Sequence, residues 1–546
     1  MADAVVIGAG PNGLVAANLL VDEGWDVVVL EEQAEPGGAV RSGELTKPGF
    51  THDLFSAFYP LAAVSPILKG LDLESLGLRW SHAPAVLAHP LPDGSCALLS
   101  RDIDATASSV DAFATGDGDA WRRMFELWQR IGDPLIEALF TPFPPVSSGV
   151  RVAAALRRDL LRFMRLMVLP VRRYAEEEFN GAGAGLLIAG NAMHTDLMPE
   201  TPASTIYGWL LSCLGQQAGF PVPEGGAGRL TDLLARRFES RGGALYCNSR
   251  VTKVMVRDGK ATGVRTEHGD VIEARRAVVA DTGAPALFRD LVGPEHLPAS
   301  VMDDIRRFQY DNSTVKVDWA LEGPIPWKAD EAGSAGTVHL ADDMDHFSDF
   351  ALQLTKRLIP SRPFLIIGQM TTSDPTRSPA GTETAWAYTH VPQEPVGDAG
   401  GDLKGSWDGR ETTAFVARMQ DRIEELAPGF KDLISATHVF TPPVMEAANA
   451  NLVGGALNGG TAQIHQQLIF RPHCGFGRPE TAIRNLYLAS ASAHPGGGVH
   501  GAPGANAAQA ALLPQKLRRR SAALGAAVAL AAAGAAAARQ AGSGRR

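Results

Sequence analysis

The chain has 546 residues, of which 45% are hydrophobic and 20% charged, a composition typical of a globular protein large enough for two connected domains. Its formal net charge of −10 provides no positive field for a phosphate backbone, which argues against a nucleic-acid partner. The cysteines form no Cys-x-x-Cys pair, which excludes a dithiol redox centre and predicts no metal site; they are Cys96, Cys213, Cys247 and Cys474.

The first 31 residues carry the clearest motif. An apolar run over 5–7 is followed by the glycine-rich hexapeptide 8–13, a helical stretch over 14–20 and a second apolar run over 26–30 that ends at Glu31. Strand, Gly-x-Gly-x-x-Gly, helix, strand and acid together form the dinucleotide fingerprint. The glycines allow close approach to a pyrophosphate, the helix N-terminus offers N–H groups to it, and the acid is placed to accept hydrogen bonds from ribose hydroxyls.

The next ten residues narrow the cofactor. After Glu31 and Glu32, the pair Gly37 and Gly38 provides a second site of close backbone approach, and Arg41 follows it. This arrangement is similar to the extended fingerprint of FAD-binding flavoproteins, which plain NAD dehydrogenases do not usually carry. The sequence therefore predicts FAD as the cofactor.

The middle of the chain supplies elements but few chemical signals. Apolar residues at helical spacing predict a helix over 119–139 and further helix over 185–220, where His194 is interpreted as a structural residue. Short apolar runs separated by glycine turns over 244–280 predict strands that return to the nucleotide domain. The size of the segment 295–470 suits a domain that covers the substrate.

Two segments are candidates for contact with a membrane surface. Residues 151–173 combine seven arginines with apolar residues at helical spacing, which predicts a basic amphipathic helix. The alternative, a surface helix whose apolar stripe lies in the core, is favoured by the acidic run over 176–178. The second candidate, 518–539, is mostly alanine, which is barely apolar enough to insert, so we favour a surface-associated or disordered tail. Because the fingerprint begins at residue 5, we expect no signal peptide and a cytoplasmic protein.

The last chemical segment lies over 485–504. It reads as a strand, a glycine-rich loop and a helix from about residue 505, and such a loop at a helix N-terminus suits the electron-rich edge of a reduced flavin ring. His494 is the candidate catalytic residue, with a positioning or proton-relay role beside the flavin. The alternative for His494 is a loop histidine bonded to backbone.

These motifs together resemble the phytoene desaturase-like FAD-dependent oxidoreductases, in particular desaturase-type carotenoid ketolases and the pyridine nucleotide-disulfide oxidoreductase domain-containing homologues. The resemblance extends from residue 3 to about 515 and includes Pro36-Gly37-Gly38-Ala39, Asn451-Leu452-Val453-Gly454-Gly455, Leu468-Ile469-Phe470-Arg471-Pro472 and His494-Pro495-Gly496-Gly497.

The resemblance implies an α/β fold with a discontinuous Rossmann-type FAD-binding domain of glutathione-reductase type and an inserted α+β substrate domain. The FAD-binding domain is expected over 1–80, 221–294 and 471–515, the substrate or membrane-facing domain over 81–220 and 295–470, and an Arg/Ala-rich tail over 516–546. It also implies hydride transfer from a C–H bond to flavin N5.

The chain departs from the family pattern at two points. Family members often have glycine where this chain has Ser490 and Ser492, and related amine oxidases carry arginine at the position of Ala39, for which Arg41 is a candidate substitute. The predicted cofactor-binding residues are Gly8, Gly10, Pro11, Asn12, Gly13, Glu31, Glu32, Gly37, Gly38, Arg41, Val251, Ser492, Pro495, Gly496 and Gly504.

The sequence thus predicts a FAD-dependent oxidoreductase that removes hydride from a hydrophobic substrate of isoprenoid or carotenoid type. No second dinucleotide fingerprint follows, so oxygen or a quinone is expected to reoxidise the flavin. One alternative is a flavin amine oxidase, although residues 486–504 offer only Tyr487 where such enzymes place paired aromatics. The alternative from another class is a non-catalytic FAD-binding scaffold, whose flavin no small substrate would reduce.

Overall fold

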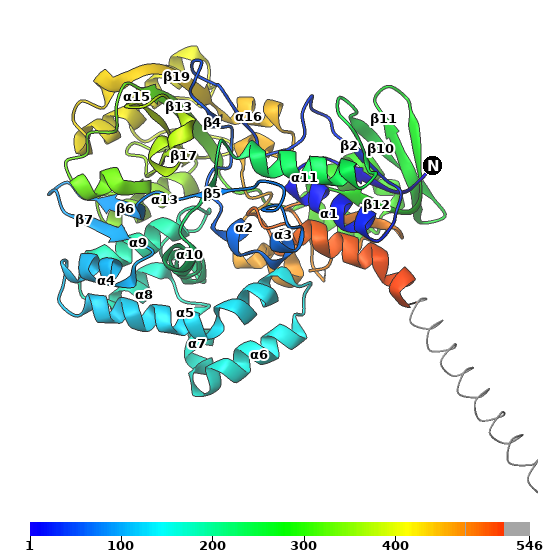
Figure 1. The fold of residues 1–546 in the computed structure, drawn as a ribbon, viewed down its shortest axis with the longest axis horizontal. Coiled ribbons are helices and arrows are strands. Elements are labelled where there is room, and N and C mark those ends of the chain that lie inside the picture. The colour runs from blue at the N-terminus through cyan, green and yellow to red at the C-terminus, as the bar shows by residue number, and fades with distance from the viewer. Residues whose placement is uncertain (476, 518–546) are drawn as a thin grey trace, which may run out of the picture.

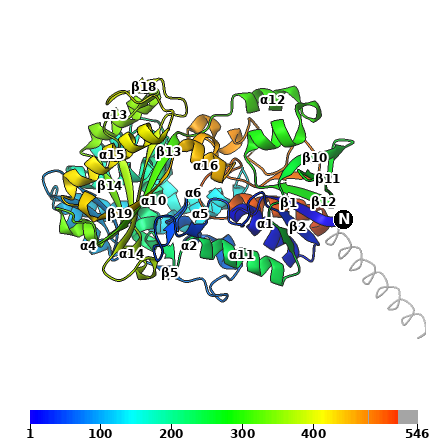
Figure 2. The ribbon, with the colours of Figure 1, turned by 90° about the horizontal axis from the view of Figure 1, so that it is seen from above.

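The computed structural model describes residues 1–475 and 477–517. Two large β-sheets lie side by side, each with its own helices, and a third, helical region extends below the second sheet (Figures 1 and 2). The predicted tail over 516–546 is described only to residue 517, and the candidate membrane segment 518–539 lies outside the described residues.

The first sheet contains the predicted fingerprint strands. Its strand order is β10-β11-β12-β1-β2-β9, and β20 pairs with the free edge of β12. The strands β9, β2, β1, β12 and β20 run parallel, whereas β10 and β11 form an antiparallel extension. The bounds are β1 (Ala2–Ile7), β2 (Val27–Leu30), β9 (Ala244–Tyr246), β10 (Val251–Arg257), β11 (Lys260–Thr266), β12 (Val271–Ala280) and β20 (Leu486–Leu488).

Both faces of this sheet are covered, which explains its unbroken apolar strands. Val6 and its neighbours on one face pack against α1 (Pro11–Asp22), α11 (Gly228–Ser240) and the helix that begins at residue 502. Val5 and Ile7 on the opposite face pack against residues 284–305, which include α12 (Ala299–Arg306). Successive residues of β1 thus alternate between two cores, as the geometry of a strand requires.

The second sheet has the order β19-β13-β17-β16-β14-β6-β7 and is antiparallel except where β14 pairs with β6. Ile367 faces a core formed with α15 (Gly409–Leu426), whereas Ile366 and Trp386 face the helical region. The bounds are β6 (Ala85–Pro90), β7 (Cys96–Leu99), β13 (Ser313–Leu321), β14 (Ala335–Leu340), β16 (Leu365–Gln369), β17 (Glu383–Val391) and β19 (Ile434–Phe440).

The helical region confirms the periodicity seen in the sequence. The stretch 119–139 forms most of α5, and its residues Trp121, Trp128 and Ile131 are buried in one core with α9 and α10. The helices are α4 (Ile103–Asp111), α5 (Asp117–Phe140), α6 (Val146–Leu156), α7 (Leu160–Leu166), α8 (Val171–Glu178), α9 (Ala182–Ala192) and α10 (Ser204–Ala218).

The remaining elements are short. They are the strands β3 (Ser42–Gly43), β4 (His52–Asp53), β5 (Trp80–Ser81), β8 (Val222–Pro223), β15 (Leu358–Ile359) and β18 (Gly397–Asp398), and the helices α2 (Pro60–Val64), α3 (Pro66–Gly70), α13 (Met344–Thr355), α14 (Met370–Ser373) and α16 (Pro442–Ala448). The strands of the first sheet fall within the predicted FAD-binding ranges and those of the second within the predicted substrate ranges. The domain limits themselves stay a prediction.

Residues 151–173 do not form the one continuous amphipathic helix that was predicted. The end of α6, a tight turn over 157–159, α7 and the start of α8 share this segment. Arg157 has a φ of +50°, which ends α6, and Pro170 separates α7 from α8 because proline disfavours helix in the residue before it. No helix within residues 1–475 and 477–517 is long and apolar enough to cross a bilayer.

A buried ionic cluster joins the two halves of the molecule. Asp53 of β4 accepts a hydrogen bond from the backbone N–H of Ala227 at 2.8 Å, on the side of the first sheet. It also lies 3.1 Å from the guanidinium of Arg377, which pairs with Asp374 at 2.9 Å. Its backbone carbonyl accepts a hydrogen bond from Lys316 of β13 at 3.0 Å. All four charged side chains are almost completely buried, so each depends on its partners.

Replacing Arg377 by alanine should therefore lower the free energy of unfolding by about 3–5 kcal/mol, because Asp53 and Asp374 would remain buried without their cation. Urea unfolding followed by tryptophan fluorescence measures the change. The matched control is Arg289→Ala, since that side chain is 64% exposed and forms an ion pair with its neighbour Asp290; a loss under about 1 kcal/mol is expected there. Equal losses in the two variants would contradict the role of the cluster.

Candidate functional site

The glycine-rich turn between β1 and α1 is built as the fingerprint predicts. Gly8 has a φ of +91°, and Gly10 is the N-cap of α1, whose first residue is Pro11. A Cβ on Gly10 would lie 2.6 Å from a carboxylate oxygen of Asp281, and one on Gly13 would overlap the carbonyl oxygen of Gly8. The turn therefore requires glycine for close packing.

Glu31 lies at the end of β2 and faces this turn. Its carboxylate accepts hydrogen bonds from the N–H groups of Ala9 at 2.7 Å and Gln33 at 2.9 Å, and the residue is 7% exposed. Glu32 is exposed instead, with its carboxylate 3.6 Å from Arg250. The structure thus brings Glu31 into the predicted site and places Glu32 at its outer surface.

The second glycine pair packs directly on the first turn. Gly37 and Gly38 have φ values of +125° and +56°, and a Cβ on Gly38 would lie 3.0 Å from the Cα of Gly10. The guanidinium of Arg41 donates to the carbonyls of Gly38 at 3.0 Å and Ala448 at 2.9 Å, and burial lowers its pKa. Arg41 thus anchors this second turn.

The other predicted residues reach the turn from distant parts of the chain. Val251 begins β10 and is buried in the same core as Ile7 and Leu30. Gly504 packs on α1 so closely that a Cβ would overlap the backbone carbonyl of Asn12. Gly504 thus contacts the fingerprint turn itself, whereas Val251 packs in a core that it shares with β1 and β2.

A buried arginine, which was not among the predicted site residues, holds the C-terminal loop in place. Arg471 is 1% exposed and donates to the carbonyls of Ala491 at 2.8 Å, Asn458 at 2.9 Å and Thr461 at 3.0 Å. It also lies beside Gly496, which a Cβ would bring to 3.4 Å from the guanidinium carbon. One side chain therefore fixes the positions of two loops.

Within that loop the predicted residues separate into two groups. Ser492 lines the central cavity and donates from its hydroxyl to the Gly459 carbonyl at 2.8 Å. Pro495 and Gly496 lie behind the cavity lining, as does His494, whose Nε2 is 3.1 Å from the carbonyl oxygen of Thr141. Burial lowers the pKa of His494. Its geometry matches the alternative of a loop histidine bonded to backbone.

A carboxyl group outside the predicted set occupies the centre of the turn. Asp281 follows β12, is 7% exposed, and accepts a hydrogen bond from the Gly13 N–H at 2.8 Å. Burial raises its pKa to about 7. Asn451 donates to the Asp281 carbonyl at 3.0 Å and accepts from the Gly283 N–H at 2.9 Å, so it clamps the end of β12. The predicted end of a strand at 281 was the sequence feature that could have identified Asp281.

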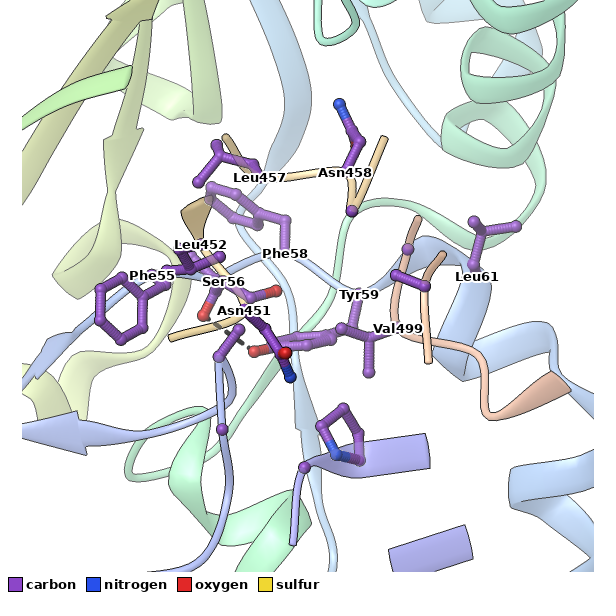
Figure 3. A pocket seen from close by; sticks show the side chains of 18 of the residues that line it. Phe55, Ser56, Phe58, Tyr59, Leu61, Asn451, Leu452, Leu457, Asn458 and Val499 are labelled. Atoms are coloured by element: carbon purple, nitrogen blue, oxygen red, sulfur yellow. Dashed lines mark hydrogen bonds between the residues drawn. The ribbon is translucent and has the colours of Figure 1, made fainter. Parts of the chain in front are cut away.

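A cavity of about 350 Å³ extends from this turn to the second sheet (Figure 3). At one end it is lined by Gly10, Pro11 and Asn12, and at the other by Trp386 and Tyr388 of β17. Between them, apolar and aromatic side chains from three segments of the chain converge, namely Phe55, Phe58, Tyr59, Leu61, Leu452, Leu457 and Val499. The Tyr59 hydroxyl points back to the Ser56 carbonyl, to which it donates at 2.8 Å.

His194 also lines this cavity, contrary to its interpretation as a purely structural residue. It lies in the loop between α9 and α10 and is hydrogen-bonded to His339 and Tyr388. No sequence pattern indicates this group, because its members are 49 or more residues apart. His339 and Tyr388 both pair with Ile366 in the second sheet, and His194 joins them from the loop between α9 and α10.

The turn and cavity fit FAD. The oxygen Asn12 Oδ1 is buried without a hydrogen-bond partner and lies at the cavity wall, so it is available to a ligand N–H or O–H group. The N-terminus of α1 and the glycine turns would hold the pyrophosphate, and Glu31 the ribose. The loop over 490–499 would contact the ring, whose redox chemistry belongs to the cofactor.

Replacing Gly13 by alanine should abolish stable FAD binding, because its Cβ would displace the Gly8 carbonyl and open the turn. The ratio of flavin to protein absorbance in the purified variant measures the effect, and a fall of about tenfold or more is expected for a displaced pyrophosphate site. Gly149→Ala in α6 is the control, since a Cβ there meets nothing. Retention of flavin in Gly13→Ala would contradict this assignment.

The chain is similar in sequence or in fold to several known proteins over almost its full length. It is 28% identical to mouse pyridine nucleotide-disulfide oxidoreductase domain-containing protein 2, an alignment that covers 93% of this chain and 92% of the relative. It is 25% identical to the lycopene-forming phytoene desaturase of Pseudescherichia vulneris, over 95% of this chain and 100% of the relative. The fold matches the crystal structure of an oxidoreductase from Methanosarcina mazei with a TM-score of 0.60 at 15% identity, over 93% and 99% of the two chains.

The family model described as flavin containing amine oxidoreductase matches residues 12–512, which include the end of the glycine turn, every strand of the first sheet except β1, the second sheet and the C-terminal loop. This match confirms the predicted FAD cofactor and the predicted α/β fold with a Rossmann-type sheet. The chain therefore belongs to the flavin containing amine oxidoreductase family and is a FAD-dependent oxidoreductase.

Proposed function

We propose that this flavoprotein dehydrogenates a lipophilic substrate of isoprenoid or carotenoid type, as the name of its phytoene desaturase relative suggests. The cavity carries the proposal, because apolar and aromatic side chains line it from the dinucleotide turn to the second sheet. The single carboxyl group among the lining residues is Asp281, which is already hydrogen-bonded to the Gly13 N–H. Such a lining favours an uncharged substrate over a cation.

The bound flavin would supply the acceptor for a hydride that leaves a substrate C–H bond for N5, while the neighbouring carbon loses a proton and a C=C bond forms. The chain's own contribution is to orient the substrate and exclude water. Phe55, Phe58 and Leu457 converge on the cavity and serve both purposes (Figure 3). Reoxidation by oxygen or a quinone completes the cycle, since two electrons must leave the flavin and the sequence holds no second dinucleotide fingerprint.

A flavin amine oxidase is the second candidate, and the family description favours considering it. Its usual pair of facing aromatic rings has no counterpart in residues 486–504, where Tyr487 is 8% exposed and packs in the core of the first sheet. Trp386 and Tyr388 do line the cavity, but they are stacked on each other along one strand, with ring centroids 5.9 Å apart. Their arrangement offers one aromatic wall and supports the lipophilic substrate instead.

An anaerobic visible spectrum tests the proposal. Addition of a carotenoid precursor in liposomes should bleach the flavin band near about 450 nm, because the flavin takes up the substrate hydride. A control with empty liposomes accounts for scattering. Bleaching by amines alone would move the assignment to an amine oxidase, and a flavin that no substrate reduces would favour the non-catalytic scaffold.

We also propose that α6 and α7 bring the enzyme to an anionic membrane surface, where such a substrate would be dissolved. Five apolar side chains on these helices and the loop after α7 are 56–77% exposed, namely Val146, Val150, Leu161, Met164 and Val168. The exposed residues 468–470 adjoin them, because Gly477 contacts both Phe143, just before α6, and Ile469. The helices form the lower edge of the molecule in Figure 1.

Charge supports a bilayer as the occupant of this surface. Arg157, Arg158 and Arg162 flank the apolar residues, and each is exposed. Other arginines of the segment are paired with acids of neighbouring helices, such as Arg165 with Glu177 at 2.6 Å. The basic character is therefore concentrated in the turn between α6 and α7, beside the apolar side chains that would enter the interface. The free state of all four cysteines supports a reducing compartment on the protein's side of that membrane.

Co-sedimentation with phosphatidylglycerol vesicles tests this surface. The double variant Leu161→Glu/Met164→Glu should bind at least about tenfold more weakly, because two acids would replace buried apolar contacts and repel the anionic lipid. The matched control Val271→Glu/Val396→Glu changes two side chains that are 51% and 64% exposed elsewhere. Equal binding by the two double variants would exclude α7 as the contact.

A further inference from the structure

The far end of the cavity contains a chain of three hydrogen-bonded rings that the dehydrogenation itself does not require. His339 lies on β14 and is completely buried, His194 lies in the loop after α9, and Tyr388 lies on β17. The two Nε2 atoms of the histidines are 2.9 Å apart, and Nδ1 of His194 is 3.3 Å from the Tyr388 hydroxyl. His194 and Tyr388 both line the cavity.

Both histidines are neutral. Burial lowers the pKa of His194 to about 3 and lowers the pKa of His339 well below its usual value. Two neutral imidazoles joined through their Nε2 atoms share one proton, so one ring donates and the other accepts. The direction of this bond fixes every other proton in the chain.

The packing of His339 sets that direction. Its Nδ1 is buried without a hydrogen-bond partner and lies against α9, where a Cβ on Gly190 would overlap it. A proton on Nδ1 would leave a buried N–H donor unpaired, which is rarer and more costly than an unpaired lone pair. His339 therefore carries its proton on Nε2 and donates it to His194.

The positions of the protons on His194 and Tyr388 follow from this direction. His194 accepts at Nε2, so its own proton lies on Nδ1 and is donated to the Tyr388 oxygen. That oxygen then cannot donate its hydroxyl proton back to His194. Burial raises the pKa of Tyr388 well above its usual value, so the hydroxyl stays protonated. Within the described part of the chain no other acceptor bonds to it, which leaves this O–H donor for whatever occupies the cavity.

We propose that Tyr388 donates a hydrogen bond to an oxygen atom of the substrate, which is therefore an apolar molecule that carries one carbonyl, hydroxyl or ether group and not a pure hydrocarbon. Thr337 supports this assignment, because the residue lines the cavity and is 1% exposed, and its hydroxyl has no hydrogen-bond partner among the residues that the structure describes. The inference rests on the proposed function for the lipophilic character of the substrate, and it adds the polar group that the cavity recognises.

A hydrocarbon in this cavity would leave the Tyr388 donor unpaired, whereas an oxygenated molecule of the same skeleton would satisfy it. The test therefore compares farnesal with β-farnesene, which have the same number of carbons. Binding to the FAD-loaded protein is followed by tryptophan fluorescence, since Trp386 lies in the cavity wall. Farnesal should bind about tenfold more tightly, the difference expected for one satisfied buried donor.

In Tyr388→Phe the preference for farnesal over β-farnesene should fall to about one, because the variant has no donor for the aldehyde oxygen and no donor that β-farnesene would leave unpaired. Tyr207→Phe is the control, because it removes another buried hydroxyl, which donates to the Ala462 carbonyl at 3.2 Å and lies outside the cavity lining. Equal affinities in the native protein, or a preference that survives Tyr388→Phe, would overturn the inference.

A second variant keeps the test decisive if Tyr388→Phe loses β-farnesene binding and has therefore failed to fold. His339→Met replaces the Nε2–H donor by a thioether sulfur, which can only accept, so His194 can carry its proton on Nε2 and accept the Tyr388 hydroxyl at Nδ1 in place of the ligand. The preference for farnesal should then fall towards one, and an unchanged preference would overturn the inference. Flavin reduction is measured separately, so a preserved preference without any reduction would refute the dehydrogenase proposal alone.

Discussion

The structure depends on how closely the backbone can approach the N-terminus of α1. Four segments meet there, from the first turn, the second glycine pair, the end of β12 and the helix that begins at residue 502. Gly38 packs on Gly10, Gly504 packs on the carbonyl of Asn12, and Asp281 receives the N–H of Gly13. A side chain at any of these glycines would separate the segments, so the glycine turn and the segments packed around it share one steric requirement.

The turn at the N-terminus of α1 also forms one end of the cavity that the second sheet lines. The second sheet contributes Trp386 and Tyr388, while Leu452 and Leu457 come from the connection that returns to the first sheet. Arg471 and Asn451 hold that connection through hydrogen bonds to backbone carbonyls and N–H groups. The substrate region is thus positioned by polar contacts to backbone, which leaves its side chains free to be apolar.

Much of the first sheet could be predicted from the sequence, because its motif residues are local. The run over 5–31 contains the strand, turn, helix and acid in one stretch, and each has a defined spacing. The helix over 119–139 was predictable for the same reason. By contrast, Asp281 and Tyr388 reach the site through strand pairing, and His194 reaches it from the loop between α9 and α10; no local spacing records either contact. The arginines over 151–173 gave a misleading impression of one helix, since the break at Arg157 is a backbone feature without a proline or glycine signal.

The ionic cluster around Asp53 has a consequence for recombination between relatives. The chain passes repeatedly between the two sheets, so a substrate region cannot be exchanged as one continuous block. Any chimaera that takes residues 52–53 from one parent and the segment around Arg377 from another must bring compatible charges into a completely buried contact. Family members that differ at either position would give chimaeras that lose their fold before their substrate preference could be compared. Exchanges that keep Asp53, Lys316, Asp374 and Arg377 from a single parent would preserve the connection between the sheets.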